Sequence, residues 1–331
     1  MWDFSISKSI GLMARTAPYV LFRMAVYFGI AVAYVLITGT GAGIGYGIGA
    51  FGDQDFQISS SFWGGIIGFG ATAGAVYLAR EYILYVVKAG HIAVLVELID
   101  GRALPEGQGQ IAYGADVVRE RFVQSSVLFG LDQLIKGVIA AVTGLMQGIA
   151  NFLPIPGLQP LVSMFRAFLK VAVGFVDEVI LAHAMRTRAD NPWAAAEEAL
   201  VLYGQNHRQM IKNAAFIAVV VYVLSFLVFL VMLAPAALVV YLIPGSWSAG
   251  GLVFALLFAW AVKAALIEPL AICCMLQAFF TVTDGQTPDP TWRDRLNELS
   301  RKFKSIGEKA QSWVGGTSPA QTISGAQGVR P

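Results

Sequence analysis

The chain has 331 residues, of which 56% are hydrophobic and only 13% are charged, and its mean hydropathy is +0.65. A soluble domain carries about 25% charged residues, so this composition excludes an ordinary soluble protein and places most of the chain in lipid. The formal net charge of +2 is too small to indicate a nucleic-acid partner. The two cysteines, Cys273 and Cys274, are adjacent in an apolar run without metal-ligand spacing. We therefore expect them to be packing residues, and we expect neither a metal site nor a cofactor.

The first predicted hairpin, residues 24–83, follows an amphipathic N-terminus, residues 1–23, that suits the bilayer surface. Its first span runs from about Met24 to Ala50 and its second begins at about Phe62. Glycines recur every four residues on two neighbouring faces of the first span, and small residues at this spacing let helix backbones approach closely. We predict tight packing within the hairpin, with an oligomer interface or a glycine-lined pore as alternatives. The predicted contact residues are Gly39, Gly43, Gly47, Gly64 and Gly68, with Gly41, Gly45 and Gly49 on the neighbouring face.

The second predicted hairpin, residues 123–185, carries the most charge. Charged side chains at membrane depth normally face a bundle interior or a wet cavity. We therefore expect this hairpin to line a cavity, or to lie partly re-entrant or at the interface. The charged residues are Asp132 and Lys136 in its first helix, and Arg166, Lys170, Asp177 and Glu178 in its second.

The third predicted hairpin, residues 214–283, contains Lys263 and Glu268, and Glu268 directly precedes Pro269. Lys263 and Glu268 are five residues apart, whereas pairs on one helix face are three or four apart, so each is expected to find a partner on another span. Proline also frees a backbone carbonyl one turn earlier. These two residues and the charges of the second hairpin form a candidate polar pathway. The alternatives are buried structural pairs and lysine or arginine side chains that snorkel to the headgroups.

Charge predicts the topology. The turns at 51–61, 151–160 and 243–250 contain no Lys or Arg, whereas most basic residues lie in 1–23, 80–121, 186–212 and 293–309. Since basic segments stay in the cytoplasm, we expect both termini there. The predicted fold is an all-α, polytopic membrane helix bundle of about six spans, arranged as three hairpins with cytoplasmic amphipathic helices. The membrane domain is residues 24–283, an amphipathic helix follows at 284–312, and residues 313–331 form a disordered tail.

Each hairpin ends at a polar elbow that opens an amphipathic helix. The elbows are Asp100–Pro105, Arg188–Pro192 and Asp284–Pro290, and we expect Asn191 to cap the helix after the second elbow. Internal duplication is one interpretation, because duplicated hairpins occur in transporters; the other is that elbows simply favour Pro, Gly and Asp. The amphipathic helices, at 107–122, 193–212 and 291–309, suit the headgroup layer. They could gate a pathway, bind anionic lipid head groups or dock a partner.

One region resembles a known family. Residues 191–206 read NPWAAAEEALVLYGQN, and Lys212-Asn213 follow before a span. This is similar to the C-terminal membrane half of the choline transporter-like family, in which a polar segment ending in Tyr-Gly-x-Asn precedes a span. The run from Cys274 to Asp284-Gly285 resembles a late helix of that family. The resemblance covers about a third of the chain, which has fewer spans than that family and lacks its large outer loop. Fold-level likeness does not transfer function, so no binding residues are carried over.

Two functional hypotheses follow. The first is a transporter or channel for a small polar solute or a lipid head group. The second is a non-transporting membrane scaffold or assembly protein that binds lipid and partner proteins. The sequence contains no G-x-S-x-G or H-E-x-x-H arrangement, so we do not expect an enzyme. The expected partners are the bilayer, anionic lipid head groups and a second copy of the chain. Convergence of the polar pathway on a wet cavity would favour transport, and dry pairs or interfacial positions would favour a scaffold.

Overall fold

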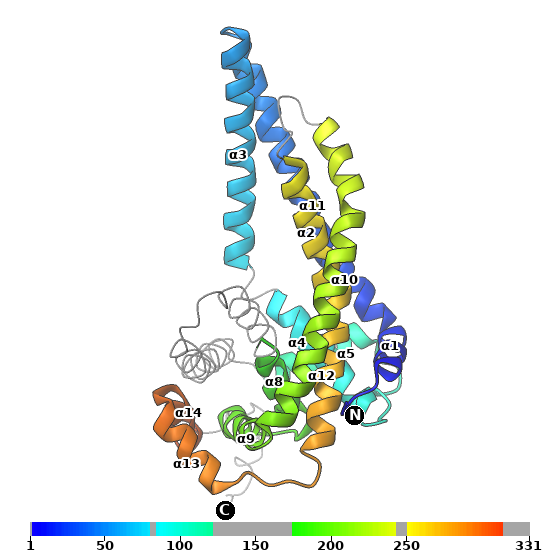
Figure 1. Cartoon of the computed structure of the whole chain (residues 1–331), viewed down its shortest axis with the longest axis vertical. Coiled ribbons are helices and arrows are strands. Elements are labelled where there is room, and N and C mark those ends of the chain that lie inside the picture. Colours follow the sequence, from blue (N-terminus) through cyan, green and yellow to red (C-terminus); the bar gives the residue numbers. More distant parts are fainter. Residues whose placement is uncertain (1, 80–83, 122–173, 243–249, 314–331) are drawn as a thin grey trace, which may run out of the picture.

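A computed structural model describes residues 2–79, 84–121, 174–242 and 250–313, and every regular element in this part of the chain is a helix (Figure 1). The all-α prediction is therefore confirmed for these residues. The helices are α1 (Ile6–Arg15), α2 (Ala17–Gly49), α3 (Gln54–Ala79), α4 (Tyr85–Ile99), α5 (Gln110–Arg121), α8 (Val176–Arg186), α9 (Pro192–Gln205), α10 (His207–Leu242), α11 (Gly250–Val262), the π-helical turn η2 (Lys263–Ile267), α12 (Glu268–Val282), α13 (Pro290–Leu299) and α14 (Arg301–Gln311).

The molecule has two parts, which Figure 1 shows end to end. The stalk consists of α3, α11 and the projecting lengths of α2 and α10. The body consists of α1, α4, α5, α8, α9, α12, α13 and α14. In the body α4, α8 and α12 contact one another, and α9 packs against α8 and α14. The stalk therefore rises from a helical body that has its own core.

Among the described residues, three stretches are long and apolar enough to cross a bilayer: Ala17–Gly49, His207–Leu242 and Gly251–Val282. They indicate a membrane protein. The six predicted spans are not confirmed. The second predicted span falls in α3, whose glycines and serines lower its hydropathy, and α3 is not among the three stretches. Most of the second hairpin lies outside the described residues, as do Asp132, Lys136, Arg166, Lys170 and nearly all of the predicted tail.

The α2–α3 contact uses a different glycine face from the predicted one. A Cβ atom added to Gly41 would lie 2.2 Å from the carbonyl oxygen of Gly64, and one added to Gly68 would lie 2.5 Å from that of Ile37. In contrast, a Cβ atom on Gly43 or Gly47 would meet nothing within 4 Å. Gly64 and Gly68 are thus at the contact, but Gly43 and Gly47 are not. Both faces of α2 repeat every four residues, so spacing alone could not choose between them.

The helices predicted to lie in the headgroup layer pack largely against the body instead. Trp193, Ala196 and Leu200 on α9 are buried, and α14 buries Phe303 and Ile306 against it. Asn191 caps α9 as predicted, since its side-chain oxygen accepts hydrogen bonds from two backbone N–H groups of the first turn. These apolar stripes stabilise protein–protein packing between helices, so they are not free to lie on lipid.

The three elbows share a backbone feature. α4, α8 and α12 are followed by residues with positive φ: Gly101 at 75°, Arg188 at 51° and Gly285 at 67°. At the first two, a backbone N–H after the elbow returns to a carbonyl inside the helix, from Arg102 to Glu97 and from Ala189 to Ala184, as in a Schellman C-cap. Arg188 therefore adopts the conformation that glycine adopts at the other two elbows. Internal duplication stays a prediction.

Candidate functional site

The charged residue of α12 that we singled out, Glu268, has its partner on α2. Arg23 is 1% exposed, and its Nη2 atom lies 3.8 Å from the Glu268 carboxylate. The same Nη2 atom donates a hydrogen bond to the backbone oxygen of Ala264 at 2.6 Å. We call Arg23, Glu268 and the Ala264 carbonyl the polar junction. It joins α2 to the third apolar stretch.

The helix break next to Pro269 explains why the Ala264 carbonyl is available. In a π turn each N–H bonds to the carbonyl five residues earlier, and the N–H of Glu268 does bond to Lys263. The donor for Ala264 would then be residue 269, which is proline and has no N–H. The guanidinium of Arg23 supplies the missing hydrogen bond. A buried carbonyl without a donor costs about 1–3 kcal/mol, so this contact stabilises the break.

In the polar junction Arg23 lies near the start of its apolar stretch, whereas Ala264 and Glu268 lie near the middle of Gly251–Val282. The helix rises ~27 Å from Gly250 to Glu268, and ~39 Å separates Arg23 from Gly49 at ~1.5 Å per residue. The hydrocarbon core of a bilayer is about 30 Å thick. A bilayer that covers the stalk from its far tip would therefore end close to the polar junction, at the body.

A second charged cluster lies in the body, where α4 meets α8. Lys88 Nζ is 2.7 Å from a carboxylate oxygen of Glu178 and 3.6 Å from one of Asp177. Burial lowers the pKa of Lys88, but the carboxylates of Glu178, Asp177 and Glu268 outweigh it and hold that pKa above its ordinary value. Burial and the neighbouring Asp177 carboxylate raise the pKa of Glu178 well above its ordinary value. Two carboxyl groups thus share one ammonium group, which favours a proton on Glu178.

A buried histidine lies between α4 and the start of α2. His91 is 1% exposed, its ring stacks on that of Tyr19 at 4.9 Å, and its Nε2 atom is 3.1 Å from Thr16 Oγ1. Burial, helped by Arg23, lowers the pKa of His91 to about 3. Since Thr16 already donates to the Leu12 carbonyl, the Nε2 atom is the donor to Thr16. His91 is therefore a neutral packing residue where α4 meets the start of α2.

Three of the predicted pathway residues that the structure describes therefore belong to two neighbouring groups of ion pairs, close enough for Glu268 to act on Lys88. Glu268 pairs with Arg23, while Asp177 and Glu178 pair with Lys88. Lys263 is half-buried in η2. Arg23 and Lys88 were not predicted as site residues. A signal for Arg23 existed, because it is the only charged residue between Ala17 and Gly49.

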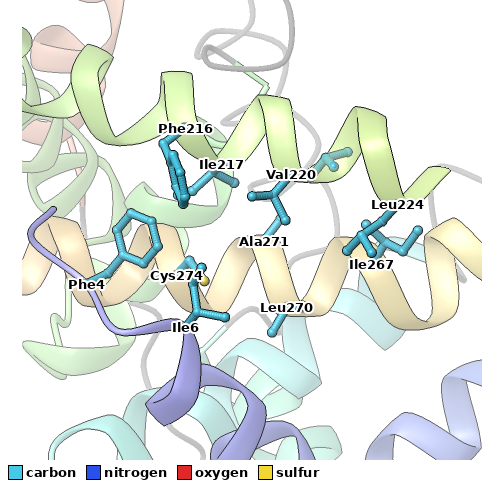
Figure 2. Close-up of a pocket in the computed structure, with 11 residues that line it drawn as sticks. Phe4, Ile6, Phe216, Ile217, Val220, Leu224, Ile267, Leu270, Ala271 and Cys274 are labelled. Carbon is cyan, nitrogen blue, oxygen red and sulfur yellow. The ribbon is translucent and has the colours of Figure 1, made fainter. Parts of the chain in front are cut away.

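An apolar pocket lies beside the polar junction, between α10, α12 and the N-terminal strap, which is residues 2–6 (Figure 2). The strap is fixed at its start: the ring of Trp2 stacks on Phe216 at 4.5 Å, and the Asp3 backbone N–H donates to Asn213 at 3.0 Å. Figure 2 shows Phe4 and Ile6 on one side of the pocket, facing side chains of α10 and α12. The enclosed space is about 20 Å³, enough for about one water molecule. The lining residues are Phe4, Ile6, Phe216, Ile217, Val220, Val221, Leu224, Ile267, Leu270, Ala271 and Cys274.

Comparison with protein family models, curated proteins and solved structures finds no match. The resemblance to the choline transporter-like family stays a prediction.

Proposed function

We propose that this chain is a non-transporting membrane scaffold, in which the stalk anchors the helical body against one face of a bilayer. One observation carries the proposal: of the charges expected to form a polar pathway, Asp177, Glu178 and Glu268 are ion-paired near the body instead. Arg23, at 1% exposure, forms an ion pair with Glu268 and donates a hydrogen bond to the Ala264 carbonyl. An ion or solute pathway needs charges that stay available at mid-bilayer, whereas these charges are ion-paired within the protein.

The pocket supports the same proposal. Its lining is apolar and its enclosed space is about 20 Å³, so it offers a polar solute neither hydrogen-bond partners nor room. The basic residues of the body suggest its side of the membrane, because positive segments remain in the cytoplasm. We therefore propose that the body is cytoplasmic and presents its surface to partner proteins there.

A transporter is the second candidate, and one observation favours it. Membrane helices broken by a π turn and proline often form binding sites for ions and substrates, and η2 followed by Pro269 is such a break. In that case the contact between Arg23 and Ala264 would open during transport.

Flux measurements separate the two candidates. The purified full chain is reconstituted into liposomes, and uptake of choline, glycerol phosphate, Na⁺ and protons is measured against protein-free liposomes. A scaffold gives uptake equal to the protein-free control, both for the natural chain and for Arg23→Met. Saturable uptake that Arg23→Met abolishes would overturn the scaffold proposal. Arg293→Met is the matched control, since Arg293 forms an ion pair with Glu197 in the body.

A further inference from the structure

The apolar pocket is part of a surface that continues along the stalk. On α10 the side chains of Val219 and Val223 are exposed beside the lining residues, and Leu266 is exposed next to the lining residue Ile267. Exposed large apolar side chains continue along α10 as far as Leu242. Exposed apolar side chains of α10 and η2 therefore adjoin the pocket lining, so hydrocarbon around the stalk would lie next to the pocket.

Basic side chains lie at the body end of the same helix face. Arg208, Lys212, Phe216 and Val220 follow one another at four-residue intervals on α10, which places them on one face. Arg208 and Lys212 are exposed, and Lys212 Nζ lies 3.6 Å from the Asp3 carboxylate and 5.9 Å from the centre of the Trp2 ring. Positive charge thus precedes the apolar lining, in the order in which a phospholipid presents phosphate and then hydrocarbon.

The N-terminal strap and the start of α1 expose residues that are typical of a membrane interface. Trp2, Ile6 and Ile10 are exposed although they are large and apolar, and Lys8 is exposed between them. Tryptophan and lysine beside apolar residues are typical of the boundary between headgroups and acyl chains. The bilayer boundary inferred from helix length lies at the same level, close to the polar junction.

We propose that the pocket under the N-terminal strap binds one acyl chain of an anionic phospholipid, whose phosphate lies against Arg208 and Lys212. The enclosed space is about 20 Å³, so only a short section of one chain enters the pocket, and the rest of the lipid stays in the bilayer. The inference rests on the proposed anchoring of the body against a membrane, and it names lipid as the ligand of that junction.

Native mass spectrometry of the detergent-purified full chain tests the pocket. Dioleoyl phosphatidylglycerol is titrated in, and the bound fraction is compared between the natural chain, Ala271→Leu and Ala237→Leu. Ala271 lines the pocket, whereas Ala237 is exposed on α10 near its far end. Ala271→Leu should weaken lipid binding about tenfold, because the added carbons displace about two CH₂ groups of the chain. Ala237→Leu should leave binding unchanged, and equal binding by all three proteins would overturn the pocket assignment.

The charge assignment has its own comparison. Replacing Arg208 and Lys212 together by Gln should reduce the preference for phosphatidylglycerol over phosphatidylcholine about thirtyfold, since each basic residue near a membrane surface contributes about 1 kcal/mol. Lys302 and Lys304, which are exposed on α14 in the body, are replaced by Gln as the matched control and should leave the preference intact. If the natural chain shows no preference between the two lipids, the assignment of an anionic headgroup is refuted.

A photolabelling measurement covers the case in which Ala271→Leu does not fold. Phosphatidylglycerol with a diazirine in its acyl chain is irradiated with the unmodified protein, and labelled peptides are mapped. Labels should concentrate in residues 216–224 and 267–274, and labels spread evenly over the stalk would overturn the inference. Failure of the scaffold proposal is a separate observation, because it would appear as solute flux in liposomes whether or not lipid occupies the pocket.

Discussion

Replacing Arg23 by Met is the most informative perturbation of the polar junction, because Met keeps the apolar stem and removes the guanidinium. The Ala264 carbonyl then loses its donor, which costs about 1–3 kcal/mol. Attraction between unit charges at the 3.8 Å separation from Glu268 is about 4 kcal/mol at an effective dielectric constant of about 20. Since Glu268 is 35% exposed, solvent screening reduces this contribution to about 1 kcal/mol. Removing the buried guanidinium also removes its desolvation cost, which offsets about as much as the attraction to Glu268 contributes. The net loss of stability should therefore be about 2 kcal/mol.

Reversible unfolding in mixed detergent micelles, followed by circular dichroism, measures this value. Arg23→Met, Glu268→Gln and the double variant form a cycle whose coupling free energy should be about 1 kcal/mol. Pro269→Ala adds a decisive comparison, because it restores a backbone N–H that can reach the free carbonyls. In the Pro269→Ala background, Arg23→Met should cost less than half of what it costs in the natural chain.

The matched control is Arg293→Met, which removes an arginine that is 44% exposed and pairs with Glu197 at 3.0 Å. Exposed ion pairs contribute about 0–1 kcal/mol, so this variant should unfold nearly as the natural chain does. If Arg23→Met is no more destabilising than Arg293→Met, the polar junction does not stabilise the helix break. An unchanged cost in the Pro269→Ala background would show that proline is not the reason the carbonyl is free.

Two further outcomes are expected. Gly45→Ala should destabilise the chain by about 1–3 kcal/mol, because a Cβ atom there would lie 2.0 Å from the α3 backbone; the control Gly43→Ala, with nothing within 4 Å, should be neutral or slightly stabilising in the same unfolding assay. Burial and Asp177 raise the pKa of Glu178, so the folded state binds a proton more tightly and stability should fall as pH rises from about 4.3 through that raised value. Glu178→Gln should remove this pH dependence. Melting temperatures of both proteins are measured between pH 4 and pH 9, and equal slopes against pH would contradict the prediction.

Local patterns predicted the start of α9 but not the breaks within the predicted helices at 193–212 and 291–309, since α9 ends at Gln205 and α13 ends at Leu299. Asn191 was expected to cap a helix that begins with Pro192, and the structure has this cap. Asp289 caps α13 in the same way. These features depend on a few neighbouring residues, because the orphan N–H groups of a first helical turn are satisfied by the side chain just before it. The sequence around each cap therefore contains all the information needed to predict that cap.

The partners of charged residues could not be predicted, because pairing depends on how helices are placed in space. Arg23 meets Glu268 across 245 positions of the chain, and Lys88 meets Glu178 across 90. Arg23 was grouped with the interfacial N-terminus, residues 1–23, because the first span was predicted to begin at Met24. The structure differs because α2 begins at Ala17, before the predicted start of the span at Met24, which places Arg23 inside the helix and against η2.

Apolar periodicity was also insufficient to distinguish lipid from protein as the neighbour of a helix. The stripe of α14 that contains Phe303 and Ile306 has the spacing expected of an interfacial helix, yet both residues are 0% exposed on the body. The N-terminal α1 buries Ser9 and Leu12 while Ile6 and Ile10 remain exposed. A headgroup helix and a docked helix need the same amphipathic pattern; what separates them is whether apolar residues remain exposed after packing.

The polar junction and the apolar pocket are linked through η2. Arg23 holds the Ala264 carbonyl, and the lining residues Ile267, Leu270 and Ala271 follow within the next two turns. A π turn inserts one residue into a helix and changes which side chains share a face, so η2 sets the direction in which these three residues point. Loss of the Arg23 bond should therefore alter lipid binding even though Arg23 does not line the pocket. In the phosphatidylglycerol titration, Arg23→Met should weaken binding while Arg293→Met leaves it unchanged, and equal binding by the two would show that the break and the pocket are independent.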